Sequence, residues 1–166
     1  MNLSLPDCGT PLTVVSFLGS GASSNVYSCI NEPSGQVYAA KVARSTSPSA
    51  SSILQNEERI LRRLLLQPQI PLAPPPCSIP SMVALLPCHS DHHPMTLITQ
   101  PVGQVLTAEL LTEHERLAFT ELPQQVVAAL RYSHRLGYVH RDVRPANLIL
   151  TTSPESPLLH FHLIDW

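Results

Sequence analysis

The chain opens with apolar positions that alternate with polar ones, which is the two-residue period of β-strands. This pattern predicts strands at residues 12–18, 25–30 and 36–43. Residues 31–35 read Asn-Glu-Pro-Ser-Gly, a composition typical of a tight turn, so a turn is expected between the second and third strands. The N-terminal part of the chain is therefore predicted to be a β-sheet.

Helical periodicity first appears in residues 53–66. At about 100° per residue, the apolar side chains of this segment fall on one stripe. The stripe consists of Ile53, Leu54, Ile60, Leu61, Leu64 and Leu65. Ser51 or Ser52 is expected to cap the helix, since a serine oxygen can accept a hydrogen bond from an unpaired N–H of the first turn.

A second helix is predicted at residues 120–136. Pro123 is expected in its first turn, where a missing N–H costs little. Gly137 is expected to end the helix as a left-handed cap.

Short apolar runs predict four more strands. Two of them, residues 82–86 and 95–99, precede the second helix. The other two, residues 147–151 and 159–164, follow it and are joined by the turn-forming segment 152–157. We expect this last pair to form a hairpin.

Two segments of biased composition interrupt the pattern. Residues 45–52 (STSPSASS) are expected to be a flexible polar loop. Residues 68–80 contain many prolines, which favour extended backbone without regular hydrogen bonding. We interpret the Pro-rich loop as a surface connection, with a ligand for an SH3 or WW domain as the alternative.

The composition excludes several classes of protein. Hydrophobic residues make up 43% of the 166 residues and the formal net charge is −2, which argues against a disordered chain and against a strongly basic, nucleic-acid-binding face. No run approaches the ~18 apolar residues that cross a bilayer, and residues 1–15 lack the features of a secretory signal. We therefore expect an intracellular, cytoplasmic protein without membrane or nucleic-acid partners.

The four cysteines are scattered and do not predict a disulfide framework. One cluster could hold a metal, because cysteine and histidine are the ligands of structural zinc. It consists of Cys77, Cys88, His89, His92 and His93. Cys77 lacks a partner at the short spacing usual for zinc, so a solvated loop is the favoured interpretation.

A glycine-rich segment joins the first two predicted strands, Leu18-Gly19-Ser20-Gly21-Ala22-Ser23-Ser24-Asn25-Val26. Its small residues would let backbone N–H groups approach a phosphate. A simple hairpin turn explains the same composition. A strand follows the glycines, whereas a dinucleotide-binding fingerprint requires a helix.

Lys41, the only lysine in the chain, lies among apolar residues of the third strand. A lysine there must be solvated or paired, because burial of an unpaired charge is costly. Glu57 lies near the centre of the apolar stripe of the first helix and would also need a partner. We therefore predict a Lys41–Glu57 ion pair, with a rim position for Glu57 as the alternative.

The most specific motif is His140-Arg141-Asp142-Val143-Arg144-Pro145-Ala146-Asn147, followed by Ile164-Asp165-Trp166. Its HRDxxxxN spacing is that of a protein-kinase catalytic loop. Asp142 could accept a hydroxyl proton. Asn147 and Asp165 could hold Mg²⁺ that carries a nucleotide phosphate.

With these motifs in family order, the chain resembles the first part of a protein kinase domain. The resemblance implies an α+β, bilobal fold, with a complete N-lobe of antiparallel sheet plus helix C, and only the first part of the helical C-lobe. The N-lobe and hinge would be residues 1–102, and the partial C-lobe with the catalytic loop residues 103–166.

The resemblance also assigns a role to each candidate residue. ATP would lie between the lobes, and Lys41, held by Glu57, would pair with its α- and β-phosphates. Asp142 would orient the acceptor hydroxyl of a protein substrate, Arg144 would replace the usual catalytic-loop lysine, and Asn147 and Asp165 would hold Mg²⁺. The implied ATP-binding residues are Leu18, Gly19, Ser20, Gly21, Ser24, Val26, Ala39, Lys41, Thr99, Gln100 and Val102.

Three residues depart from the family pattern. Ser24 replaces the third glycine of the loop, Arg144 replaces lysine, and Trp166 stands where phenylalanine is usual. An Asp-Trp pair is also common in kinase-like enzymes that act on small molecules, so a small-molecule kinase is one alternative. The sequence stops at Trp166, before the elements that bind a protein substrate. We expect little or no phosphotransfer from residues 1–166 alone, and a non-catalytic pseudokinase that binds nucleotide or a partner is the other alternative.

Overall fold

The computed structural model describes residues 3–4, 11–65, 79–86, 94–113, 115–153 and 156–166. The cysteine and histidine cluster considered as a zinc site, and nearly all of the Pro-rich loop, lie outside these residues. The chain forms two compact units. Unit 1 comprises residues 1–59 and 81–102, and unit 2 comprises residues 60–80 and 103–166.

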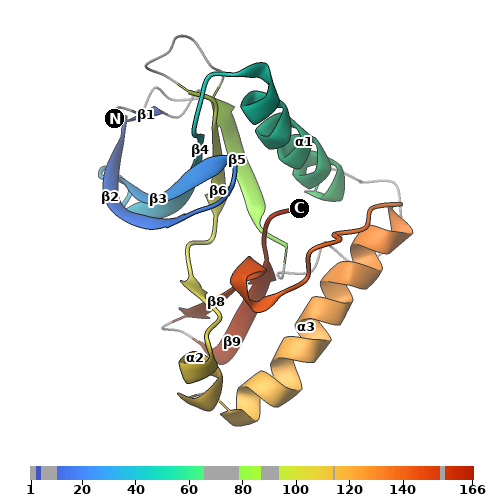
Figure 1. Cartoon of the computed structure of the whole chain (residues 1–166). Helices are drawn as coiled ribbons and strands as arrows, with labels where there is room; N and C mark the ends of the chain where they lie inside the picture. Colours follow the sequence, from blue (N-terminus) through green and yellow to red (C-terminus); the bar gives the residue numbers. More distant parts are fainter. Residues whose placement is uncertain (1–2, 5–10, 66–78, 87–93, 114, 154–155) are drawn as a thin grey trace. The chain divides into compact units, whose positions relative to one another are not determined.

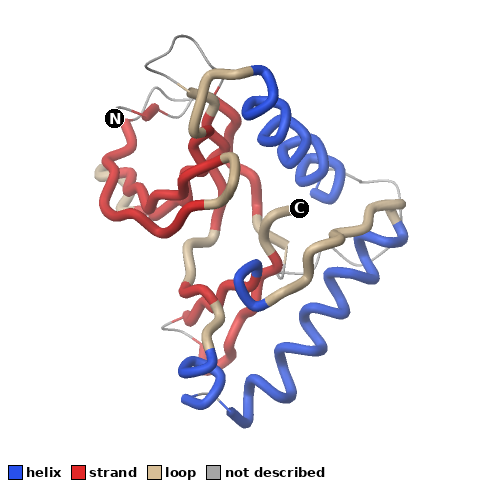
Figure 2. The backbone as a smooth tube through the Cα atoms, in the orientation of Figure 1, coloured by secondary structure: helices blue, strands red, loops and turns tan. Residues whose placement is uncertain are grey.

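Unit 1 is built on an antiparallel sheet with the strand order β1-β2-β3-β4-β6-β5 (Figures 1 and 2). Its strands are β1 (Leu3–Ser4), β2 (Pro11–Ser20), β3 (Ser24–Asn31), β4 (Gln36–Ala43), β5 (Ser81–Leu86) and β6 (Thr96–Gln100). The five strands predicted in this part of the sequence are confirmed, each to within two residues at either end. The turn after β3 is also confirmed, and Gly35 has the positive φ of 69° that favours glycine there.

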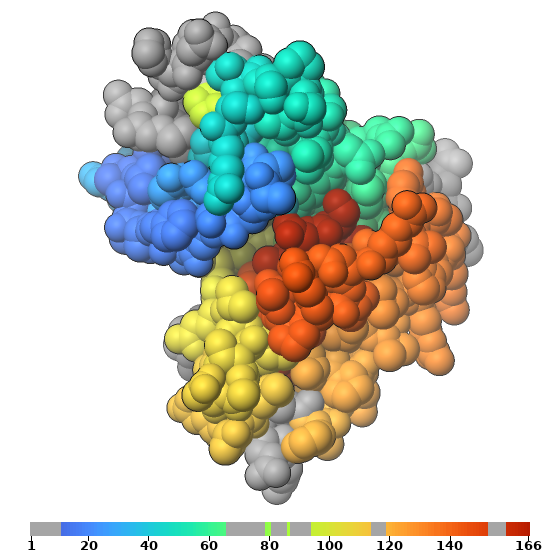
Figure 3. Space-filling view, viewed as in Figure 1, coloured from blue at the N-terminus to red at the C-terminus, as the bar shows by residue number. Residues whose placement is uncertain are grey.

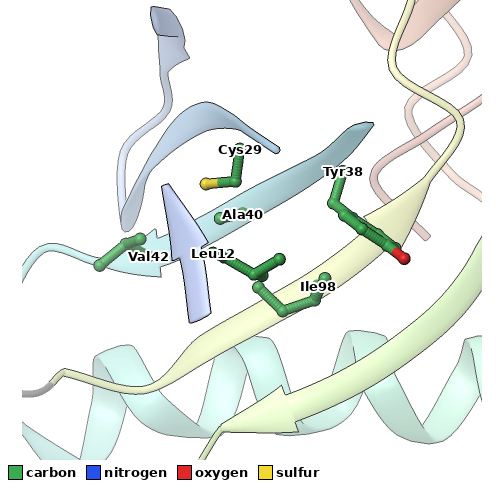
Figure 4. Packing of buried hydrophobic residues seen from close by; sticks show 6 residues of the cluster. All are labelled: Leu12, Cys29, Tyr38, Ala40, Val42 and Ile98. Atoms are coloured by element: carbon green, nitrogen blue, oxygen red, sulfur yellow. The ribbon is translucent and has the colours of Figure 1, made fainter. Parts of the chain in front are cut away.

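The register of the sheet separates a core face from a second face. Cys29 and Ile30 point to opposite sides of β3, as neighbours in a strand must. The core face carries the buried cluster shown in Figure 4, which consists of Leu12, Cys29, Tyr38, Ala40, Val42 and Ile98. The residues between them in sequence, including Ala39 and Lys41, lie on the second face. Apolar burial on the first face thus fixes which side chains the second face presents.

Helix α1 (Pro48–Leu65) begins five residues earlier than predicted. The backbone N–H of Ala50 donates to Ser47 Oγ at 3.3 Å, and the N–H of Ser51 donates to the Ser47 carbonyl at 3.1 Å. Ser47 is therefore the cap, rather than Ser51 or Ser52, and Pro48 takes the first helical position, where its missing N–H is tolerated. The expected loop at 45–52 is wrong from Pro48 onward.

The apolar stripe of α1 is confirmed with one exception. Leu54, Leu61 and Leu64 are at most 1% exposed, whereas Ile53 is 48% exposed and lies outside the buried stripe. The residues of α1 from Ile60 onward belong to unit 2, where the hydroxyl of Tyr132 donates to the Leu64 carbonyl at 2.8 Å.

Unit 2 contains a small antiparallel sheet with the order β7-β8-β9. Its helices lie between β7 and β8 in the sequence. Its elements are β7 (Gln104–Val105), α2 (Ala108–Glu113), α3 (Glu115–Arg135), the 3₁₀ turn η1 (Pro145–Asn147), β8 (Leu148–Ser153) and β9 (Ser156–Leu163). The predicted hairpin is confirmed as β8 and β9, whose strands extend into the segment expected to be the linker. None of the described helices is long and apolar enough to span a membrane.

Helix α3 also begins five residues before its predicted start, and Pro123 is inside it rather than in its first turn. A proline at this position leaves the carbonyl four residues earlier, that of Phe119, without its helical partner. Phe119 is 75% exposed, so water can solvate this carbonyl. At the other end, Gly137 has a φ of 82°, and its N–H donates to the His134 carbonyl at 3.0 Å, which confirms the predicted cap.

Gly103, which leads into β7, is required by close packing. A Cβ atom at this position would lie 2.5 Å from the carbonyl oxygen of Leu150 and 2.9 Å from Cγ2 of Thr151. Gly103→Ala is expected to lower the free energy of unfolding by about 1–3 kcal/mol, as overpacking does. Urea unfolding measures this loss. Gly19→Ala is the control, because a Cβ there meets nothing within 4 Å, and an equal loss in both variants would contradict the account.

Candidate functional site

Four of the candidate nucleotide-binding residues of unit 1 share the second face of the sheet. Val26 pairs with Lys41, and Ala39 pairs with Thr99, in the antiparallel registers of β3, β4 and β6. Because directly paired residues point to the same face, and because residues two apart on one strand do so as well, these four side chains form one surface. Val26, Lys41, Ala39 and Thr99 are all partly buried.

The predicted ion pair between Lys41 and Glu57 is present on this face. Lys41 Nζ lies 2.6 Å from Glu57 Oε2, and the two side chains are 16% and 9% exposed. The pair therefore joins β4 to the middle of α1 in a largely desolvated setting. There, loss of one partner would leave an uncompensated charge. The ammonium is fixed at a defined point on the face, where it can donate to a second anion.

The glycine-rich segment forms the tight turn between β2 and β3, in which the Gly21 N–H donates to the Ser24 carbonyl at 2.9 Å. Leu18 is the extra residue of a β-bulge just before the turn, between the Phe17–Tyr27 and Gly19–Val26 pairs. Neither glycine has a positive φ or a crowded neighbour, since a Cβ on Gly21 would meet only the Ser24 carbonyl, at 4.0 Å. Space is thus open around the turn, and Ser20, an exposed residue, lies in it.

Residues 99–102 lead out of β6 and end unit 1. The side-chain amide of Gln100 donates to the Val37 carbonyl at 3.1 Å, which ties this segment to β4. Thr99, Gln100 and Val102 are all partly exposed. Because Thr99 pairs with Ala39, this segment begins at the face that carries Ala39 and Lys41.

In unit 2, the catalytic-loop motif folds around Asn147. The Asn147 amide Nδ2 donates to the backbone carbonyl of Asp142 at 2.9 Å and to Oδ2 of the same residue at 2.8 Å. Arg144 Nε lies 3.1 Å from Asp142 Oδ2, with both side chains more than half exposed. Asp142 is therefore aimed by one amide and one guanidinium, and its segment is open to solvent on the face viewed in Figure 3.

Asn147 and Asp165 fit the donor set that Mg²⁺ prefers. Both hydrogens of the Asn147 amide are directed to Asp142, so its Oδ1 is the atom that it can offer to a cation. The N–H of Ile164 donates to the Asn147 carbonyl at 2.9 Å, so Asp165 follows a residue that is bonded to Asn147. An amide oxygen and a carboxylate on adjoining segments are suitable hard oxygen ligands.

His140 connects the two segments of this site. Its Nδ1 accepts the Asp142 N–H at 3.3 Å, so the ring proton is on Nε2, which donates to the Ile164 carbonyl at 2.8 Å. Burial lowers the pKa of His140. The hydrogen bond to Ile164 and the charges of Asp165 and Asp142 raise this pKa, but they offset the effect of burial only in part. The ring is therefore neutral near pH 7. The His140 and Trp166 rings pack edge to face, with their centroids 4.7 Å apart.

The candidate residues thus fall into two groups. One is on the sheet of unit 1, around Lys41, and the other is on the loop and hairpin of unit 2, around Asn147. The sequence did not predict a role for His140 or for Gln125. The latter residue donates to the Leu159 carbonyl and accepts from the Phe161 N–H, both at 2.8 Å, along the edge of β9. The sequence signal for such a role would have been a polar glutamine among the apolar residues of α3, since a polar side chain there needs a hydrogen-bond partner.

Comparison with known proteins identifies the family. The sequence profile described as the protein kinase domain matches residues 12–166. The chain is 26% identical over 153 residues to calcium-dependent protein kinase 5 of Plasmodium berghei (strain Anka), covering 90% of this chain. It is 32% identical over 142 residues to calcium/calmodulin-dependent protein kinase type 1B of Rattus norvegicus and of Homo sapiens, covering 81% of this chain.

The fold is of the protein-kinase type. The chain belongs to the protein kinase domain family, and its antiparallel N-terminal sheet with one helix, followed by C-terminal helices and a hairpin, confirms the predicted fold class. It spans 24% of the Plasmodium relative's length and 37% of the mammalian relative's.

Proposed function

We propose that this chain binds MgATP and belongs to an enzyme that moves the γ-phosphate of ATP to a protein hydroxyl. Residues 1–102 would act as the N-lobe with the hinge and residues 103–166 as the start of the C-lobe. In the first, the amides of the glycine turn would approach the phosphates, and Lys41 would donate to their oxygens. Backbone groups at Gln100 and Val102 would bind the adenine edge, with Leu18, Val26, Ala39 and Thr99 around its ring.

The residues of unit 2 would orient the reacting groups. Asp142 accepts the proton of the substrate hydroxyl, whose oxygen then bonds to the γ-phosphorus. The bond from that phosphorus to the β,γ-bridging oxygen breaks, and ADP leaves with the electron pair. When bound at Asn147 and Asp165, Mg²⁺ neutralises charge on the phosphate oxygens. Arg144 adds a positive charge beside Asp142, where the transferred phosphoryl group would pass.

One observation supports this proposal more strongly than any other. The Asn147 amide gives both of its hydrogens to Asp142, which leaves its oxygen for a cation, while the Asn147 carbonyl accepts from the residue before Asp165. The proposed base is thus hydrogen-bonded directly to one proposed metal ligand, Asn147, and Asn147 is hydrogen-bonded to the residue that precedes the other, Asp165. A merely structural loop would not require this combination of groups.

Transfer of labelled phosphate from ATP tests the proposal against its two alternatives. The natural protein that contains this chain is incubated with MgATP and, separately, with mixed peptides bearing Ser, Thr and Tyr or with amino alcohols and aminoglycosides. Transfer to peptides supports the proposal. Transfer only to the small molecules would make the protein a small-molecule kinase. MgATP binding without any transfer would make it a pseudokinase.

A further inference from the structure

The side chain of Trp166 makes a hydrogen bond that the usual phenylalanine at this position cannot make. Its indole N–H donates to the Leu163 carbonyl at 2.7 Å, in a buried setting, and the residue is only 8% exposed. The bond spans a turn of four residues. It closes that turn over Ile164 and Asp165, so the indole acts on the backbone that surrounds the carboxylate.

Asp165 itself has a backbone conformation that needs support. Its φ is 66°, in the left-handed region that non-glycine residues seldom adopt. Such a conformation persists where the surroundings over-determine it. The bonds that hold this segment include those from the Ile164 N–H to Asn147, from the His140 ring to the Ile164 carbonyl, and from the Trp166 indole to the Leu163 carbonyl.

We propose that Trp166 is a positioning residue whose indole N–H, bonded to the Leu163 carbonyl, holds Asp165 in its left-handed conformation before any metal or nucleotide is bound. The ring packs on His140, but ring packing alone is available to phenylalanine. The hydrogen bond is what the tryptophan adds. Its consequence for metal binding rests on the proposed function, whereas the conformational role does not.

The Ile164 amide is the local reporter of this role, because its bond to the Asn147 carbonyl opens when the turn loosens. Its hydrogen exchange is measured on the chain without ligand, in wild type and in Trp166→Phe. A second replacement is 3-benzothienylalanine, an isostere with sulfur in place of the indole N–H. Because the chain has one tryptophan, incorporation in a tryptophan auxotroph alters only this position.

Exchange of the Ile164 amide is expected to be about tenfold faster in both replacements, the factor expected for one buried hydrogen bond. The midpoint of urea unfolding is measured alongside, and Phe119→Leu, at an exposed position, is the control for nonspecific effects. Unchanged exchange in the benzothienylalanine protein would overturn the proposal. So would an acceleration that appears equally at amides throughout unit 2, because it would indicate a general loss of stability.

Metal dependence provides the readout that separates positioning from a structural role. ADP affinity is measured with Mg²⁺ and with a chelator in the three proteins. The expected result is a loss of about tenfold for MgADP with no change for ADP alone. Equal losses of ADP affinity with and without Mg²⁺ would overturn the claim that Trp166 positions the metal ligand Asp165. If the wild-type chain binds no ADP, the proposed function fails, and the exchange measurement still decides the role of Trp166.

Discussion

Asp142→Asn is expected to lower phosphotransfer about a thousandfold in the natural protein that contains this chain, which is within the range for loss of a general base. The asparagine keeps the size of the side chain and can still accept a bond from Asn147. It cannot take the proton of the acceptor hydroxyl, and it lacks the charge that pairs with Arg144. The rate of transfer to the mixed peptides at saturating MgATP measures the loss.

Two controls make this result specific to Asp142. Glu113→Gln removes an exposed carboxylate at the end of α2 and is expected to leave the rate unchanged. ATP affinity of the Asp142 variant should stay within about twofold of wild type, because the proposed role of Asp142 is to contact the acceptor and not the nucleotide. A variant that retains more than a tenth of the rate would show that Asp142 is not the base.

Lys41→Met is expected to weaken MgATP binding to residues 1–166 by about 10- to 100-fold. This range corresponds to the about 1.5–3 kcal/mol of a hydrogen bond between charged groups. The ammonium is the cation that Glu57 fixes on the face of β4 that is proposed to bind the nucleotide. Arg44→Met, at the exposed cation three residues later, is the matched control and should bind MgATP normally. Calorimetric titration gives both affinities.

A second variant separates binding from stability. Lys41→Met leaves Glu57 buried without its partner, which is expected to cost about 3–5 kcal/mol of stability. Replacing both members, as Lys41→Met with Glu57→Leu, removes the isolated charge and should restore most of that loss without restoring ATP affinity. If the double variant binds MgATP as the wild type does, the role proposed for the pair is wrong.

The sheet of unit 1 and the ion pair could be predicted from the sequence for the same reason. Strand alternation places Lys41 opposite to the core residues Ala40 and Val42, and helical periodicity places Glu57 within the buried stripe. Two charges on apolar surfaces have few ways to be satisfied. The ion pair can therefore be predicted from the burial of the two positions, and the orientation of α1 need not be known.

The helix starts could not be predicted from the same patterns. Residues 48–52 have the composition of a loop, yet Ser47 and Pro48 together satisfy the requirements of a helix N-terminus. In α3, an interior proline is disfavoured by intrinsic propensity, but an exposed carbonyl at Phe119 makes it tolerable. In both cases, a local exception depends on hydrogen bonds that composition does not reveal.

The positioning contacts of the catalytic loop also lie beyond sequence patterns. The motif identifies Asp142, Asn147 and Asp165 by their spacing. The bonds that hold the segment of Asp165 run from His140 and Trp166 to the carbonyls of Ile164 and Leu163. Because every residue has such a carbonyl, sequence alone cannot say which one a side chain will use. Only the folded hairpin brings these groups together.

Titration of residues 1–166 with ATP, in the presence of Mg²⁺ and then of a chelator, tests the central claim most directly. We expect saturable binding at one site, about tenfold tighter with Mg²⁺, because Asn147 and Asp165 would bind the metal only in the first case. In Asp165→Asn, the two affinities should become equal. Absence of saturable binding, or binding that neither Mg²⁺ nor Asp165→Asn alters, would contradict the claim that this chain is built to hold MgATP.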